Sequence, residues 1–151
     1  MITRLDQHLI NIPDAPRLYG LRRLAIEFLY FGIKEARACL FAGLFFLAVF
    51  LCPRSGLFGI PRYDLLLVFA LVVQMLMLWT KLESWDEAKA IGLFHAVGFA
   101  LEAFKVSGSI QSWSYPDFAY TKILGVPLFS GFMYAAVGSY IIQAWRLLDI
   151  R

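Results

Sequence analysis

The sequence predicts an all-α membrane protein, a polytopic transmembrane helical bundle with four spans, and three observations lead to this class. The 151 residues are 60% hydrophobic and 17% charged, whereas soluble domains are about 45–50% apolar and about 25% charged. The apolar excess is concentrated in residues 31–52, 63–80, 90–106 and 124–145, and about 20 such residues cross a bilayer. The blocks are continuous and do not alternate, which disfavours a β-barrel.

The segment before the first block is predicted to lie at the membrane surface. Prolines keep residues 11–16 out of a helix, and Asp14 is a candidate N-cap. Apolar residues then recur at helical spacing from Leu18 to Phe28, with Arg22 and Arg23 among the polar residues between them. This pattern indicates an amphipathic surface helix. The alternative is that the same residues extend the first span.

The four spans are bounded by recognisable signals. The first ends at Pro53, and the second has Tyr63 and Trp79 at its ends, as interfacial aromatic anchors do. A charged connection, residues 81–89, precedes the third span, with Ser84 or Asp86 as its cap. Short connections favour antiparallel neighbours. We therefore treat residues 1–151 as a single membrane domain, with residues 1–30 cytoplasmic or interfacial and residues 31–151 forming the bundle.

Basic residues predict the orientation. Ten lysines and arginines fall on the side of the two termini and the 81–89 connection, against four on the other side. The positive-inside rule then places both termini in the cytoplasm of a multi-pass protein of the inner (plasma) membrane. The net charge of +3 is explained by this topology, so no nucleic-acid partner is expected.

The third span carries the residues best suited to chemistry. His95, Gly98, Glu102 and Lys105 follow one another at steps of three, four and three, which places them on one helix face. Because a charge in hydrocarbon costs about 2.5–3.5 kcal/mol, this face should point into the bundle. Glu102 is the candidate catalytic acid or base, and it should pair with Lys105. His95 and Lys105 are candidate ligand-binding residues, with packing and snorkelling to the interface as their structural alternatives.

The loop after the third span is predicted to cover Glu102. It is rich in serine and aromatic residues and contains Gln111, Trp113, Tyr115 and Tyr120. We interpret the first three as candidate ligand-binding residues at the mouth of a site for an amphipathic, lipid-like molecule. The alternative is an aromatic belt that anchors the loop among lipid head groups.

The other spans contain weaker candidates. Glu35 and Arg37 in the first span are candidate ligand-binding residues if they face inward, and otherwise form an interfacial charge cluster. Gly131, Ala135 and Ser139 in the fourth span are spaced by four, and such small-residue stripes allow close helix packing, including in a homo-oligomer. Three further polar residues are expected to find partners inside the bundle: Gln74, Tyr134 and Gln143.

Metal and cofactor motifs are missing from the sequence. There is no CxxC, HExxH or glycine-rich nucleotide motif, and His8 and His95 are the two histidines. Structural metal sites need a spaced set of cysteine, histidine or acidic ligands. We therefore expect neither a metal ion nor a cofactor.

Three sequence runs resemble a known family. They are residues 31–37 (FGIKEAR), 102–117 (EAFKVSGSIQSWSYPD) and 124–134 (LGVPLFSGFMY). With them the chain resembles the bacterial integral-membrane family catalogued as domain of unknown function 817. Members of that family look about twice as long, so the resemblance implies that this chain corresponds to an N-terminal half. It implies no activity.

A looser similarity concerns the membrane carotenoid hydratases and cyclases. Glu102, Gly108, Trp113, Tyr115 and the Gly-Val-Pro of residues 125–127 follow the order of a motif in those enzymes. This resemblance implies an isoprenoid-like substrate class.

Three functions remain open on the sequence alone. The first is binding or transformation of a lipid or isoprenoid-like molecule around Glu102, with an acid in a low-dielectric pocket acting in general acid–base catalysis. The second is a small-solute or proton-coupled transporter lined by Glu102, Lys105 and Arg37. The third is a non-catalytic membrane assembly subunit.

Overall fold

The computed structural model describes residues 4–10 and 20–148, which are mostly helical. The elements follow in this order: α1 (Arg4–Ile10), α2 (Leu21–Ala38), α3 (Leu40–Leu51), α4 (Arg62–Trp79), α5 (Trp85–Val106), β1 (Lys122–Ile123), β2 (Val126–Pro127) and α6 (Ser130–Leu147). The predicted all-α class is confirmed at this level.

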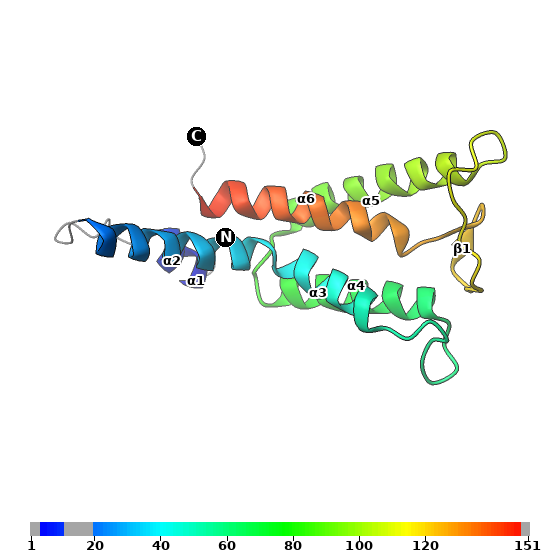
Figure 1. The fold of residues 1–151 in the computed structure, drawn as a ribbon, viewed down its shortest axis with the longest axis horizontal. Coiled ribbons are helices and arrows are strands. Elements are labelled where there is room, and N and C mark those ends of the chain that lie inside the picture. The colour runs from blue at the N-terminus through cyan, green and yellow to red at the C-terminus, as the bar shows by residue number, and fades with distance from the viewer. Residues whose placement is uncertain (1–3, 11–19, 149–151) are drawn as a thin grey trace.

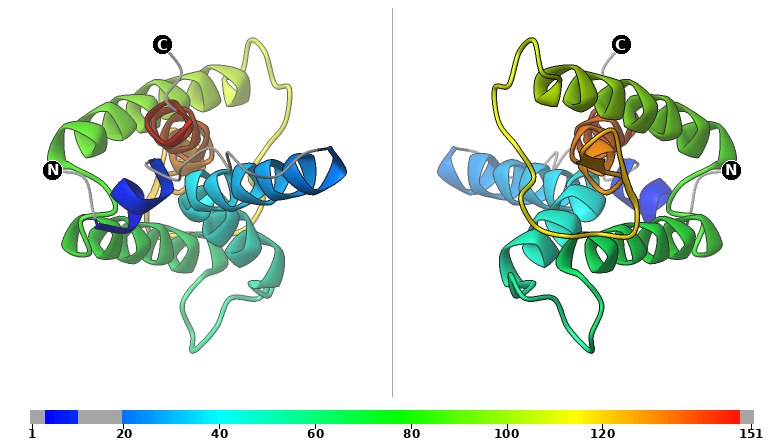
Figure 2. Two further views of the ribbon diagram at one scale, coloured as in Figure 1. Left: turned by 90° about the vertical axis from the view of Figure 1, so that its left-hand side faces the viewer. Right: turned by 90° about the vertical axis from the view of Figure 1, so that its right-hand side faces the viewer.

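The helices form an open arrangement. α6 packs most extensively on α5 and also on α3 and α2, and α3 packs on α4, so the order across the molecule is α4, α3, α6, α5. α4 and α5 are consecutive in sequence but make few contacts and lie on opposite sides of α6 and α3 (Figures 1 and 2). The bundle is therefore not closed between α4 and α5.

The second and third predicted spans correspond closely to α4 and α5. α5 begins earlier than predicted because Ser84 forms a capping box: its hydroxyl accepts from the Glu87 backbone N–H, and the Glu87 carboxylate accepts from the Ser84 backbone N–H. Such a cap satisfies backbone donors at the start of a helix. Of the two predicted caps, Ser84 is the one used.

The N-terminal predictions need correction. α2 runs without interruption from Leu21 to Ala38, so the residues predicted as a surface helix are continuous with the start of the first predicted span, and their location at the membrane surface stays a prediction. The predicted single helix over residues 31–52 is instead divided at Cys39 into α2 and α3. α2 projects beyond the other helices at one end of the molecule (Figure 1). The predicted Asp14 cap lies outside the described residues.

The helix predicted as the fourth span begins later than predicted. Residues 122–127 form a two-stranded antiparallel hairpin, and α6 starts at Ser130. The hairpin turn has positive φ at both central residues, 54° at Leu124 and 79° at Gly125. Positive φ at both positions is typical of the tight hairpin turn that matches strand twist. Leu124 and Gly125 therefore belong to a turn and not to the helix.

One helix has the length and the apolar composition expected of a membrane span. Among the residues that the structure describes, α4 is long and apolar enough to cross a bilayer, and α3 is apolar but has 12 residues. A single helix of this kind is a weak indication of a membrane location, because the core helices of soluble proteins meet the same criteria.

The small-residue stripe of α6 is used inside the chain. Ala135 and Ser139 are fully buried. A Cβ built on Gly131 would lie 2.7 Å from the His95 carbonyl oxygen, so α6 and α5 approach too closely there for a side chain. The stripe thus packs α6 against its own neighbours, and the predicted homo-oligomer stays a prediction with no surface assigned to it.

Candidate functional site

Hydrogen-bonded polar side chains gather in two clusters at opposite ends of α5 and α6. The outer cluster consists of Glu102, Lys105, Trp113, Tyr115 and Tyr134. The inner cluster consists of Asp6, Arg37, Glu83, Glu87, Gln143 and Arg146, together with the carbonyl of Leu82. "Outer" and "inner" follow the orientation predicted from the basic residues.

The outer cluster is built around the Glu102 carboxylate, which is fully buried. Its Oε1 accepts from the Tyr134 hydroxyl at 2.6 Å and from the Lys105 ammonium at 3.2 Å. Its Oε2 accepts from the Trp113 indole N–H at 3.0 Å and from the Tyr115 hydroxyl at 2.9 Å. Four donors, one of them cationic, compensate the desolvation of this charge.

Lys105 forms the exposed rim of the outer cluster. Its side chain is 35% exposed and also donates to the Tyr134 hydroxyl at 2.7 Å. The ammonium lies 4.9 Å from the centre of the Trp113 ring, within the range of a cation–π interaction. The predicted Glu102–Lys105 pair is therefore present, and it is tied to the loop through Trp113.

The loop over Glu102 is held at two further points. Asp64, at the start of α4, accepts from the backbone N–H groups of Tyr120 and Thr121 at 2.8 and 2.9 Å, and from the Thr121 hydroxyl at 2.5 Å. Lys122 donates to the carbonyl oxygens of Tyr115 and Asp117. The predicted lid is thus fastened to α4, to α5 and to its own hairpin.

Tyr115 is the central residue of this lid. Its ring meets Tyr63 edge-on at 5.8 Å, and Tyr63 in turn stacks on Phe129 at 5.2 Å. Burial raises the pKa of the Tyr115 hydroxyl, and its hydrogen bond to the Glu102 carboxylate raises it further. The hydroxyl therefore remains a donor to Glu102 throughout the physiological pH range.

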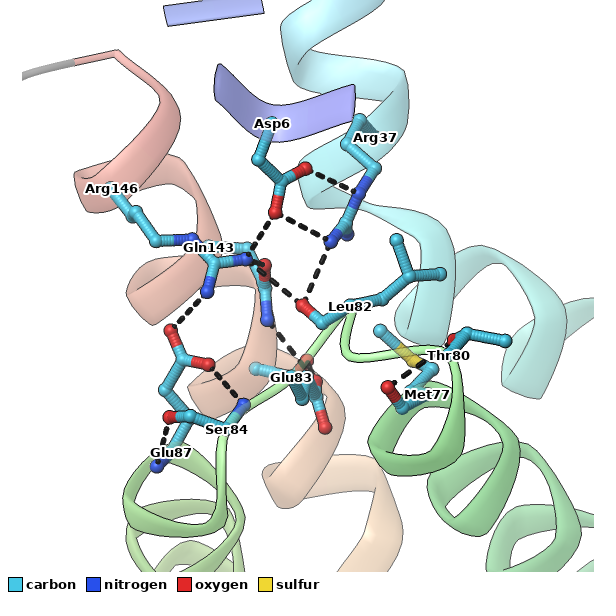
Figure 3. Close-up of polar contacts among 11 residues, drawn as sticks. Asp6, Arg37, Met77, Thr80, Leu82, Glu83, Ser84, Glu87, Gln143 and Arg146 are labelled. Carbon is cyan, nitrogen blue, oxygen red and sulfur yellow. Dashed lines mark hydrogen bonds and ion pairs between the residues drawn. The ribbon is translucent and has the colours of Figure 1, made fainter. Parts of the chain in front are cut away.

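The inner cluster joins five segments of the chain: α1, α2, the connection between α4 and α5, the start of α5, and α6 (Figure 3). Asp6 of α1 accepts from Arg37 of α2 at 3.2 Å and from Arg146 of α6 at 3.0 Å. Both arginines also donate to the carbonyl oxygen of Leu82, at 2.8 and 2.9 Å, in the connection between α4 and α5. Arg146 further reaches Glu87 at 2.7 Å, so each arginine is balanced by a carboxylate.

Glu83 extends the inner cluster into the bundle without a cationic partner among the described residues. It is 2% exposed. Its carboxylate accepts from the Ser139 hydroxyl at 2.7 Å, from the Gln143 amide at 3.4 Å and from the Gln74 amide. Neutral donors alone thus satisfy this buried carboxylate.

A groove lies in the open seam between α4 and α5. Its volume is about 370 Å³, within the range of about 300–1,000 Å³ usual for small-molecule sites. Gln74 and His95 are its polar residues. The other lining residues are Leu67, Leu71, Ala88, Ile91, Gly92, Leu128 and Phe132. The Gln74 Oε1 and His95 Nδ1 atoms are buried and have no hydrogen-bond partner among the described residues.

The structure divides the candidate site residues among these regions. Glu102, Lys105, Trp113 and Tyr115 come together, whereas the Gln111 side chain is exposed and makes no hydrogen bond in the described part of the chain. The remaining candidates lie elsewhere: His95 in the groove, Arg37 in the inner cluster, and Glu35 beside it, where it accepts from Tyr140 at 3.0 Å. The predicted internal partners of Gln74, Tyr134 and Gln143 are confirmed.

Sequence reasoning missed most of the inner cluster. Asp6, Glu83, Glu87 and Arg146 stand in charged terminal and connecting segments, whose residues predict only the orientation and the limits of the spans. No local spacing connects them, because Asp6 and Arg146 are 140 residues apart. The sequence feature that could have indicated this cluster is the high density of charged residues at one predicted end of the bundle.

Comparison with known protein families found one that matches most of this chain. Residues 27–151 match the family described as "Protein of unknown function (DUF817)". The chain is 47% identical over 124 residues to the "Uncharacterized protein YoaT" of Bacillus subtilis (strain 168), a match that covers 82% of this chain and 46% of that relative. The chain therefore spans about half the length of the curated relative it matches. No solved structure matches it.

Proposed function

This chain belongs to the DUF817 family, and we propose that it forms a membrane-spanning helical bundle that binds a lipid-like molecule in the groove between α4 and α5. In this proposal the crossings are the end of α2 with α3, then α4, α5 and α6, and both termini are cytoplasmic. The membrane is the bacterial inner membrane.

The outward surface supports the membrane part of the proposal. Large apolar side chains point away from the bundle on every long helix, among them Phe50 at 85%, Met75 at 62%, Leu93 at 65% and Val137 at 51% exposure. Apolar patches of this extent are unusual on soluble monomers. Apart from Asp64 at the start of α4, the buried charges lie in the two end clusters. The 18 residues of α4 measure about 27 Å at 1.5 Å per residue, close to a hydrocarbon core of about 30 Å.

The observation that carries the binding function is the groove itself. A four-helix bundle normally closes on a continuous core, but here α4 and α5 stay apart and leave a mostly apolar groove between two of the proposed crossings. A lipid-like molecule would enter it from the surrounding acyl chains. The opening would exclude strongly hydrated solutes, because they would first have to cross lipid.

Glu102 serves in this proposal as a structural clamp for the lid. Both carboxylate oxygens already accept hydrogen bonds from side chains of the same chain. Catalysis at Glu102 would require the loop to release Trp113 and Tyr115 first. Transport along Glu102, Lys105 and Arg37 is less favoured, because Arg37 belongs to the other end and the apolar core around Phe41 and Phe132 lies between them.

The test compares two glycine variants. A Cβ at Gly92, in the groove, or at Gly43, on the exposed face of α3, meets no atom within 4 Å. Gly92→Leu should fill the groove without disturbing the fold, and Gly43→Leu is the matched control. The protein should stay in the membrane fraction after an alkaline wash, and native mass spectrometry in mild detergent should show a retained small molecule in the wild type and in Gly43→Leu but not in Gly92→Leu.

Three outcomes would overturn the proposal. The first is recovery of the protein from the soluble fraction without detergent. The second is the absence of any retained molecule in the wild type. The third is equal retention in all three proteins.

A further inference from the structure

The polar wall of the groove points to the chemistry of the ligand head group. We propose that the groove selects a long-chain molecule whose head group donates a hydrogen bond, such as a fatty or isoprenoid alcohol, and that Gln74 Oε1 is the acceptor. This inference rests on the proposed function and specifies its ligand class.

The orientation of the Gln74 amide follows from its neighbours. An amide presents a donor NH₂ on one side and an acceptor oxygen on the other, and the two are assigned from the hydrogen-bond network. Arg146 carries donors alone, so the Gln143 oxygen turns toward it and the Gln143 NH₂ turns toward Glu83. The Glu83 carboxylate also receives the Gln74 NH₂. Gln74 Oε1 is consequently turned away from Glu83 and retains its acceptor capacity.

This acceptor is left without a partner in an apolar region. Gln74 Oε1 is buried, lies on a groove-lining residue and accepts no hydrogen bond within the described chain. Leaving such a group unpaired costs about 1–3 kcal/mol, which a donor from an occupant would recover. An ether, a hydrocarbon and an ionised carboxylate have no donor to offer this oxygen.

The shape of the groove agrees with a small head beside Gln74 and an apolar chain beyond it. Ala88 and Gly92 are one turn apart on α5, and both are small, so they leave room around the polar end. Leu67, Leu71 and Phe132 provide apolar walls for the chain. By contrast, the larger hollow of about 570 Å³ between α3 and α4 has an almost wholly apolar lining and contains no amide, carboxylate or imidazole.

Glu83 acts in this arrangement as a positioning residue. It does not line the groove, but it holds the Gln74 amide in the orientation that leaves Oε1 without a donor among the described residues. Glu83→Gln would remove this control, because a second amide accepts from or donates to Gln74 equally well.

The experiment measures binding of three probes by native mass spectrometry: hexadecan-1-ol, its methyl ether and hexadecane. The wild type should bind the alcohol about five- to tenfold more tightly than the ether, as expected for one neutral hydrogen bond to a buried acceptor. Gln74→Leu should bind the alcohol and the ether equally. Glu83→Gln should show a reduced preference while its hexadecane binding remains unchanged.

The outcomes separate this inference from the proposed function. Equal binding of alcohol and ether by the wild type, with Gly92→Leu blocking both, would overturn the inference and leave the groove as a ligand site. A preference for the alcohol that persists in Gln74→Leu would also overturn it. Failure of all three probes to bind, or a dimer whose formation depends on Gly92, would overturn both proposals.

Discussion

The outer and inner clusters differ in where their residues come from along the chain. The outer cluster lies within residues 102–134 and combines one helix, the loop that follows it and the start of the next helix. The inner cluster extends from Asp6 to Arg146 and joins α1, α2, the α4–α5 connection, the start of α5 and α6. The outer cluster therefore fixes one loop, whereas the inner cluster fixes the relative positions of distant helices.

The clusters also differ in their charge balance. In the outer cluster a single acid is surrounded by donors, and its one cation, Lys105, is partly exposed. In the inner cluster two arginines, Arg37 at 6% and Arg146 at 17% side-chain exposure, are held between Asp6 and Glu87. Because removing one partner of a buried ion pair leaves an uncompensated charge, the inner cluster should be the more sensitive of the two.

The largest effect is expected for Arg146→Met. The substitution deprives Asp6, Glu87, Gln143 and the Leu82 carbonyl of a donor. Breaking a buried ion pair costs about 3–5 kcal/mol, and we expect a loss of this size in the free energy of unfolding measured in detergent by circular dichroism.

Lys89→Met is the matched control for Arg146→Met. It also removes one cation near the same end, but its ion pair with Asp86 is exposed, at 75% and 91%. Such pairs contribute about 0–1 kcal/mol. Similar losses for the two variants would show that the inner cluster is no more important than a surface ion pair.

A smaller and more local effect is expected for Glu102→Leu. Unpaired donors would remain at Trp113, Tyr115 and Tyr134, with a loss of about 2–3 kcal/mol, since Lys105 and Trp113 are partly exposed and water compensates them in part. The loop over residues 107–121 should then be cut rapidly in limited proteolysis.

Arg146→Met provides the contrast for the proteolysis of that loop. It should lower stability more but leave the loop protected under folding conditions, because Asp64 and Glu102 still hold it. If both variants expose the loop to the same degree, the clusters do not have the separate roles that their composition indicates.

The same contrast explains what could be predicted from the sequence. The face of Glu102 and Lys105 follows from helical spacing, and the lid with Trp113 and Tyr115 follows because it is adjacent in sequence to Glu102. Tertiary pairing of Asp6 with Arg37 and Arg146 leaves no such pattern. Glu83 stands in a run of charges that looks solvated, and its burial follows only from the packing of α6 against the α4–α5 connection.

The limits of the helices could likewise be predicted only where a local sequence signal marks them. α4 and α5 follow from composition and from the Ser84 cap. The break between α2 and α3 at Cys39 contains neither proline nor glycine, so no local sequence signal predicts it. It falls next to Arg37 and Ala38, which are buried through contacts with distant parts of the chain.

The smallest expected effect is the coupling between the two clusters. Glu87 and Glu102 are 15 residues apart on α5, which corresponds to about 22 Å at 1.5 Å per residue. Sites more than about 7–10 Å apart with no shared partner usually contribute additively to within about 0.5 kcal/mol. The double variant Arg146→Met with Glu102→Leu should therefore lose the sum of the two single losses. Arg146→Met with Gln143→Leu, which removes two groups that contact each other, should lose clearly less than the sum. A coupling above about 1 kcal/mol between the ends would instead mean that α5 and α6 transmit strain along the bundle, and the two clusters would then have to be treated as one unit.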